Sequence, residues 1–179
     1  TFHFTARLSR SAHPVVKPPV SKDIRLEGVE VLIVDDNSTN RLILEEILTG
    51  WKMKPLTVAS GPEALRKMKD QKRAGQPFHL AIIDANMPDM DGIQATEVIV
   101  RDVPSAQIVI VSVQSDTDYL RRAMLVGARD FVTKPFSAEE LISTIRRVHK
   151  TGLARAQAAP QAGPMMPGGG MPGPGGPIR

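Results

Sequence analysis

Residues 31–37 read Val-Leu-Ile-Val-Asp-Asp-Asn, and residues 80–86 have the same form, Leu-Ala-Ile-Ile-Asp-Ala-Asn. Each segment is a short apolar run that ends in Asp. An apolar run without alternation is typical of a strand that helices cover on both faces. In such sheets the binding site lies at the carboxyl ends of the strands. The two segments therefore predict a parallel sheet with acidic side chains at one rim.

Working outward from these segments, five strands are expected at residues 30–34, 53–58, 79–83, 107–111 and 130–133. Between them, apolar residues repeat at helical spacing. Ser60 and Ser137 are each followed by Glu at the third position, the pattern of a capping box, so each marks a helix start. Strands that alternate with helices predict an α/β domain over residues 29–150.

The two ends of the chain differ from this domain in composition. Residues 1–28 contain a stretch with Pro14, Pro18 and Pro19, which predicts an N-terminal extension and linker. Residues 151–179 are rich in Pro and Gly, which predicts a disordered tail. Because the chain begins with Thr1 rather than Met, we expect it to be a piece of a longer protein.

Composition excludes several classes of function. The chain has 23 basic and 19 acidic residues, and its excess of positive charge falls in the two ends, so we expect no nucleic-acid binding by the domain. It has no Cys, which excludes thiol catalysis and thiolate zinc sites and favours a cytoplasmic, reducing context. No apolar run is long enough for a membrane span, so no membrane contact is expected from this segment.

Polar residues follow four of the predicted strands: Asp35 with Asp36, then Asp84, Ser112 and Lys134. Taken singly, each is an ordinary cap or loop residue. Together, three carboxylates at one rim would repel one another, which calls for a cation, and oxygen ligands favour Mg²⁺ or Mn²⁺. The Lys134 ammonium and the Ser112 hydroxyl would complete a pocket for a phosphoryl group, with Asp84 as the nucleophile.

This set of motifs resembles the receiver domain of two-component response regulators. The resemblance covers residues 29–150 and is carried by Val-Leu-Ile-Val-Asp-Asp-Asn, Ile-Ile-Asp-Ala-Asn-Met-Pro-Asp-Met-Asp-Gly, Ile-Val-Ser-Val and Phe-Val-Thr-Lys-Pro-Phe, in that order. It implies a flavodoxin-like, doubly wound five-stranded parallel sheet in the order 2-1-3-4-5 with five helices.

The resemblance also implies a role for each matching residue. Asp84 would be the phosphoryl acceptor. The Mg²⁺ ligands would be Asp36, Asp84 and the backbone carbonyl of Asn86, with Asp35 holding the metal through water. Ser112 and Lys134 would bind the phosphoryl oxygens, and Phe131 would change rotamer when Ser112 is drawn inward. The Lys134–Pro135 peptide would be cis, and Gly92 and Gly127 fit positions where a positive φ is needed.

The function implied is that of a phosphorelay signalling domain, not an enzyme with a kinase domain of its own. Asp84 would take its phosphoryl group from a histidine kinase or phosphotransfer domain. The switch would be read on the face formed by the helix near 117–126, the strand at 130–133 and the helix near 138–150, which is also a possible homodimer surface. The alternative is a pseudo-receiver, an interaction module that is not phosphorylated. Two enzyme or cofactor-binding classes are disfavoured. A haloacid-dehalogenase-like phosphatase needs a second acid at the position of Asn86, and a dinucleotide-binding Rossmann domain needs a glycine-rich motif after the first strand, where this chain has Asp-Asp-Asn-Ser-Thr-Asn.

Two further likenesses concern the surroundings of the domain. Residues 1–8, with Phe2 and Phe4, resemble the last strand of a histidine-kinase ATP-binding domain, which would make this the C-terminal receiver of a hybrid kinase. Residues 112–150 look instead like receivers fused to pilus-assembly ATPases. Val113 stands where the family often has a small residue, so we expect it to restrict access to Asp84.

Overall fold

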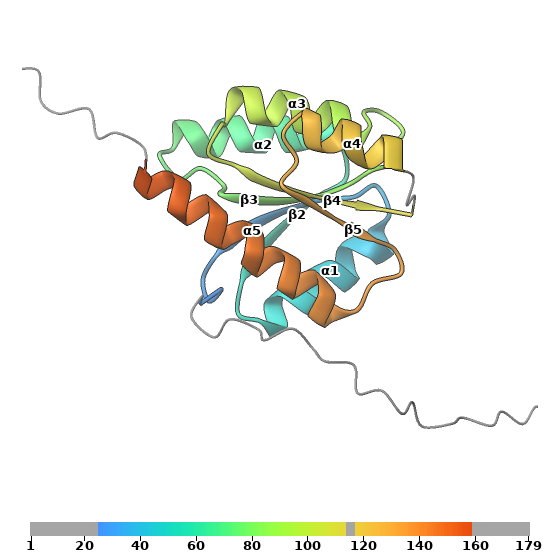
Figure 1. The fold of residues 1–179 in the computed structure, drawn as a ribbon, viewed down its shortest axis with the longest axis horizontal. Coiled ribbons are helices and arrows are strands. Elements are labelled where there is room, and N and C mark those ends of the chain that lie inside the picture. The colour runs from blue at the N-terminus through green and yellow to red at the C-terminus, as the bar shows by residue number, and fades with distance from the viewer. Residues whose placement is uncertain (1–24, 114–116, 159–179) are drawn as a thin grey trace, which may run out of the picture.

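The computed structural model describes residues 25–113 and 117–158, in which five strands and five helices alternate (Figure 1). The strands are β1 (Glu30–Val34), β2 (Lys54–Val58), β3 (Leu80–Asp84), β4 (Gln107–Ser112) and β5 (Asp130–Thr133). The helices are α1 (Ser38–Gly50), α2 (Gly61–Arg73), α3 (Gly92–Asp102), α4 (Thr117–Leu125) and α5 (Ala138–Ala158). Asp84 and Ser112, expected just after their strands, are the last residues within them.

The strands form one parallel sheet in the order β2-β1-β3-β4-β5, so the expected flavodoxin-like fold is confirmed. Helices α2, α3 and α4 cover one face, and α1 and α5 cover the other (Figure 1). Successive residues of a strand point to opposite faces. Leu32 and Val34 therefore pack under the first layer, and Val31 and Ile33 pack under the second. This double burial explains the unbroken apolar runs of the sequence.

Side-chain caps begin the helices at the carboxyl ends of the strands. The Ser60 hydroxyl accepts the N–H of Glu63 at 3.3 Å, and the Ser137 hydroxyl accepts the N–H of Glu140 at 3.1 Å, so both predicted helix starts are confirmed. Asn37 caps α1, with its Oδ1 2.9 Å from the N–H of Thr39. The caps fix where each helix starts relative to the strand before it.

The packed unit is wider than the 29–150 expected. Leu26 is buried in the core beside α1, and α5 runs past residue 150 to Ala158. Residues 151–158 contain Ala, Leu, Arg and Gln, which favour a helix, and Gly152 packs closely against Gln107. The tail is predicted to begin at residue 151, but residues 151–158 form the last turns of α5.

The two glycines singled out from the sequence have different roles. Gly127 has a φ of +110° where the chain leaves α4 for β5, as expected. Gly92 does not have a positive φ, so that expectation is wrong. A Cβ at Gly92 would instead lie 2.5 Å from the carbonyl oxygen of Asp84. Gly92 is needed because α3 starts directly against the backbone of the site.

Residues 1–24, 114–116 and 159–179 lie outside the described part. The kinase-like strand at 1–8, the linker and the Pro/Gly-rich end are therefore predictions on which the structure does not bear. Within the described ranges, no helix is both long enough and apolar enough to cross a membrane.

Candidate functional site

A lysine and two aspartates form an ion network at the carboxyl rim, the edge of the sheet where the strands end. Asp35 follows β1 and Asp84 ends β3, and these strands are neighbours. Lys134 follows β5, and its Nζ lies 2.6 Å from Asp84 Oδ1 and 3.1 Å from Asp35 Oδ2. The N–H of Lys134 donates to the carbonyl of Ser112 at 2.7 Å, and the Lys134–Pro135 peptide is cis, as the resemblance implied.

Burial sets the electrostatics of this network. Burial raises the pKa of Asp84, and this effect outweighs the hydrogen bonds from Lys134 and from the N–H of Asn86, which lower it. Burial also acts to lower the pKa of Lys134. The hydrogen bond to Asp84 and the negative charges of Asp84 and Asp35 act against it, and the net shift is upward. The lysine therefore stays charged at neutral pH and faces two carboxylates.

Asp35 is held rigidly by the first turn of α1. Its Oδ1 accepts the N–H of Asn37 at 2.9 Å, and the Asn40 amide nitrogen lies 3.2 and 3.1 Å from the two carboxylate oxygens. The guanidinium of Arg41 donates to the carbonyls of Asp35 and Asp36 at 2.7 and 3.0 Å. Sequence reasoning missed Asn40 and Arg41. Their position one helical turn after the acidic pair was the available signal.

Asp36 does not join the buried network. Its side chain is exposed, and in the described part of the chain no three His, Cys, Asp or Glu side chains converge as a metal cluster. The expected convergence of three carboxylates is therefore wrong for the buried network: Asp35 and Asp84 meet at Lys134, whereas Asp36, at the same rim, is exposed.

The oxygen donors at the carboxyl rim are nevertheless of the kind that suits a magnesium or manganese ion. Asp36, Asp84 and the carbonyl of Asn86 offer only oxygen, and Mg²⁺ commonly takes one or two carboxylates and completes its shell with water. The three carboxylates of the rim exceed the single charge of Lys134, so the rim has a net negative charge that a divalent ion would balance. The N–H of Asn86 donates to Asp84 Oδ2 at 2.8 Å, which fixes that carbonyl beside the site.

The other predicted site residues lie on β4 and β5. Ser112 is fully buried one position beyond Val111, the residue that pairs with Asp84 in the sheet. Phe131 is half-buried against the core under α2, α3 and α4. Val113 is 63% exposed just beyond Ser112, so its side chain stands at the open edge of the site.

Tyr119 of α4 is a second contact that the sequence reasoning missed. It is buried, and its hydroxyl donates to the carbonyl of Ala85, the residue after Asp84, at 3.4 Å. Burial and the charges of Asp91 and Asp84 raise the pKa of Tyr119 to about 12. The hydroxyl therefore keeps its proton, and it links α4 to the backbone beside Asp84. The only signal in the sequence was that Tyr119 is its single tyrosine.

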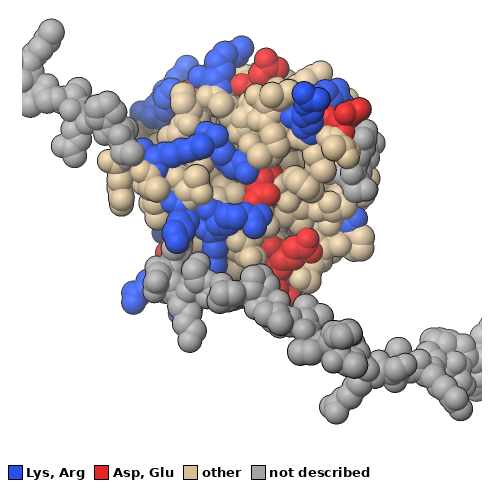
Figure 2. All heavy atoms as spheres, viewed as in Figure 1, with Lys and Arg blue, Asp and Glu red and all other residues tan. Residues whose placement is uncertain are grey.

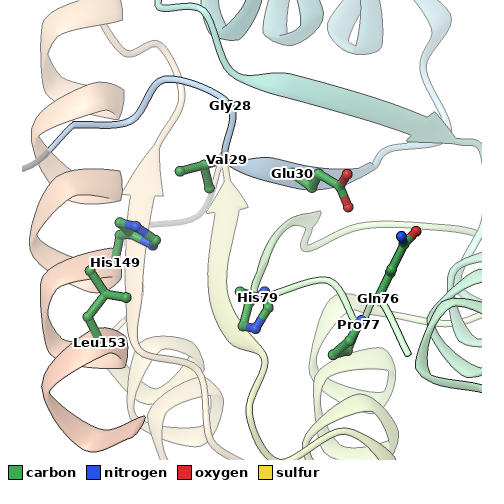
Figure 3. A pocket seen from close by; sticks show the side chains of 8 residues that line it. All are labelled: Gly28, Val29, Glu30, Gln76, Pro77, His79, His149 and Leu153. Atoms are coloured by element: carbon green, nitrogen blue, oxygen red, sulfur yellow. The ribbon is translucent and has the colours of Figure 1, made fainter. Parts of the chain in front are cut away.

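A separate cavity of about 420 Å³ lies at the opposite edge, the amino rim, where the strands begin (Figure 3). His79 and His149 line it, together with Glu30 of β1 and Leu153 of α5. Burial and the charge of His79 lower the pKa of His149. The residues of the carboxyl rim do not reach this cavity.

Known proteins are similar to this chain in sequence and in fold. A probable chemotaxis protein CheY from Rhizobium etli is 38% identical over 125 residues, which cover 68% of this chain and 93% of that protein. Sensor protein GacS from Pseudomonas syringae pv. syringae is 30% identical over 157 residues, which are 85% of this chain and 16% of that protein. The CheX-CheY-BeF3-Mg²⁺ complex from Borrelia burgdorferi has a chain that is 26% identical with a TM-score of 0.64, covering 69% of this chain and 90% of that one.

The sequence of the whole domain also matches a known protein family. Residues 31–146 match the response regulator receiver domain family. This range contains the ion network of Asp35, Asp84 and Lys134 and the neighbouring Ser112. The chain belongs to the response regulator receiver domain family.

Proposed function

We propose that this chain is a phosphorelay receiver in which Asp84 accepts a phosphoryl group. One observation carries the proposal: the Nζ of Lys134 lies 2.6 Å from Asp84 and 3.1 Å from Asp35, at a rim where Ser112 ends the neighbouring strand. A lysine ammonium thus lies against the Asp84 carboxylate, and the strand pairing brings Ser112 to the same rim. Such groups stabilise the charge of a transferring phosphoryl group.

In the proposed reaction a carboxylate oxygen of Asp84 attacks the phosphorus of the donor. The bond from phosphorus to the donor nitrogen or oxygen breaks, and its electron pair leaves with the donor. Lys134 and Ser112 then bind oxygens of the transferred group, while Asn37 and Asn40 keep Asp35 in place. Asp36, Asp84 and the Asn86 carbonyl would hold a Mg²⁺ ion, with Asp35 contributing through water, and the ion would supply positive charge to those oxygens.

Intact-mass measurement tests the acceptor. Treatment with acetyl phosphate and Mg²⁺ should add the mass of one phosphoryl group, and Asp84→Asn should abolish this gain. Asp89→Asn, an exposed residue in the loop after Asp84, is the matched control and should be labelled like the wild type. Equal labelling of the Asp84 variant would assign the acceptor elsewhere. No labelling of the wild type by any donor would favour the pseudo-receiver.

The metal requirement has its own test. Labelling should be lost in EDTA and restored by Mg²⁺ or Mn²⁺. Asp36→Asn should raise the Mg²⁺ concentration needed for half-maximal labelling. It should not lower the melting temperature of the metal-free protein. Undiminished labelling in EDTA would remove the metal from the mechanism.

We further propose that phosphorylation shifts the face formed by α4, β5 and α5, which a partner or a second copy of the chain then binds. Ser112 and Phe131 lie between the site and this face, and Tyr119 connects α4 to Ala85. Amide exchange should change on α4 and β5 after phosphorylation. A change confined to residues 35–60 would contradict the proposal.

The expected phosphoryl donor is a histidine kinase or phosphotransfer domain in the cytoplasm. The likeness to a sensor protein over 157 residues supports a place within or beside a hybrid kinase. Phosphotransfer from a candidate phosphorylated kinase domain onto Asp84, but not onto Asp84→Asn, is the direct test of that partner.

A further inference from the structure

Two arginines at the amino rim, Arg129 and Arg155, have no ion-pair partner among the residues that the structure describes. Arg129 stands just before β5, and its N–H donates to the carbonyl of Ile108 at 2.8 Å, which fixes it beside the start of β4. Its side chain is half-buried, and its Nε is a buried donor without a hydrogen-bond partner within the part of the chain that the structure describes. That Nε is shielded from solvent, so what calls for an explanation is the half-buried positive charge of Arg129, because a partly buried charge without a counter-ion is costly.

Arg155 comes from the last turns of α5 and lies on the same side. Gly152 is pressed against Gln107, the first residue of β4, because a Cβ there would lie 2.8 Å from Gln107 Cγ. Arg155 follows Gly152 by three positions and therefore shares its side of the helix. Burial and the positive charge of Arg155 lower the pKa of Arg129, which agrees with two guanidinium groups being held near each other.

The acidic residue beside them is already engaged. Asp130 follows Arg129, and its Oδ2 accepts a hydrogen bond from Arg147 Nε at 2.8 Å. Across residues 25–113 and 117–158, neither Arg129 nor Arg155 forms an ion pair. A carboxylate from outside the domain would bind the outer nitrogens of the half-buried Arg129 guanidinium, compensate its charge and offset the repulsion between the two arginines. Arginine is well suited to this because its planar group binds a carboxylate through two parallel hydrogen bonds.

The surroundings favour a protein over a nucleic acid. Lys and Arg side chains gather where the C-terminal half of α5 lies, and acidic side chains are few there (Figure 2). On the other side of β5, α4 ends with Met124 and Leu125, which are 48% and 77% exposed (Figure 1). A basic surface flanked by exposed apolar side chains matches a polypeptide with acidic and apolar residues, whereas a phosphate backbone has no apolar side chains to offer.

We propose that Arg129 and Arg155 bind a carboxylate of an acidic segment of a partner protein. The pair lies at the amino end of the face formed by α4, β5 and α5, so the inference names the chemistry of the partner expected at that face. Its role in signalling rests on the proposed function. The binding itself depends only on the two arginines and can be measured without phosphorylation.

The test uses the full 179-residue chain, unphosphorylated, and a short oligoglutamate peptide as the probe. Calorimetric titration should show that Arg129→Gln and Arg155→Gln each weaken binding about tenfold, the size of one lost charge-assisted hydrogen bond. Arg73→Gln on α2 removes the same charge at a distant, exposed position and should leave binding unchanged. The side-chain Nε–H resonances of Arg129 and Arg155 should shift during the titration.

Two results would overturn the inference. An equal loss in the Arg73 variant would mean that only net charge matters. Tighter binding of a DNA duplex, dependent on the same two arginines, would make nucleic acid the ligand. Both measurements are separate from the labelling of Asp84, so a failed phosphorylation test and a failed binding test remain distinguishable.

Discussion

The two rims of the sheet each hold charged side chains without a full set of partners, and the sign of those charges differs between the rims. At the carboxyl rim, Asp35 and Asp84 share the single ammonium of Lys134, and Asp36 adds a further negative charge. At the amino rim, Arg129 and Arg155 form no ion pair with any of the described residues. The charge that lacks a full set of partners is therefore anionic at the site where the strands end and cationic at Arg129 and Arg155, near where they begin.

The direction of the helices gives a common reason for both. Each helix begins at the carboxyl rim and returns toward the amino rim, so the positive ends of the helix dipoles point to the acidic rim and the negative ends to the basic rim. Unbalanced side-chain charge is thereby tolerated at both edges. Each rim can therefore bind a ligand of the opposite charge. We propose Mg²⁺ for the carboxyl rim and a carboxylate of a partner protein for Arg129 and Arg155.

The largest effect is expected from Lys134→Ala, which leaves two buried carboxylates without their counter-ion. The free energy of unfolding should fall by about 3 kcal/mol near pH 7. Lys69→Ala is the matched control, because Lys69 is also 3.1 Å from its partner Asp102 but its side chain is 49% exposed, against 19% for Lys134. It should lose less than about 1 kcal/mol. Urea unfolding measures both, and equal losses would show that burial does not separate the pairs.

A second comparison adds one methyl group at each rim. Gly92→Ala would push into the backbone of Asp84 and Ala85 and should destabilise the protein by about 2 kcal/mol. Gly152→Ala meets the side chain of Gln107 instead, and the gain in helix propensity offsets that contact to within about 1 kcal/mol. Thermal unfolding of the two variants should rank them in this order. A neutral Gly92 variant would mean that α3 can move away from the site freely.

Removing one excess charge from either rim should stabilise the metal-free protein slightly. Asp36→Asn and Arg155→Gln should each raise the free energy of unfolding by about 0.5 kcal/mol at low salt, because each relieves repulsion between like charges. Salt screens such interactions, so both gains should shrink as NaCl is added. Gains that are independent of salt, or losses, would contradict the account of the rims as charge-unbalanced.

The smallest effect concerns pH at the amino rim. The pKa of His149 is lowered in the folded protein, so the unfolded chain takes up its proton at higher pH, and stability should fall as pH drops below about 6.5. Glu30 and His79 also line its cavity, and His79 opposes the added charge. His149→Gln should flatten this part of the stability profile, as urea midpoints between pH 7.5 and 5 would show. Identical profiles would exclude His149 as the cause.

Sequence patterns predicted the sheet well because the strands are buried on both faces. The segments 30–34 and 130–133 coincide with β1 and β5, and polar residues after apolar runs located the site. The pattern could not tell which of the adjacent Asp35 and Asp36 is buried, because this depends on where the chain turns after β1. It also could not identify Asn40, whose contact with Asp35 exists only once α1 has formed.

The remaining misses depend on packing between distant segments. Gly92 is required by the backbone of Asp84, which no local rule for φ reveals. The length of α5 depends on the contact of Gly152 with Gln107, because Gly and the Pro-rich sequence beyond it argue for an earlier end. Arg155 lies on the side of α5 that faces Gln107 only because of that extra length, so its position was equally hidden.

The extra turns of α5 also mean that a small rotation at its first turn produces a larger movement at its far end. It has 21 residues, and at about 1.5 Å per residue it is about 30 Å long, beginning four residues after Lys134 and ending beyond Arg155. A tilt of about 5° at its first turn would move its far end by about 3 Å, roughly the length of a hydrogen bond. An adjustment at the acidic rim too small to break a contact there would then arrive at the basic rim as a displacement large enough to make or break one.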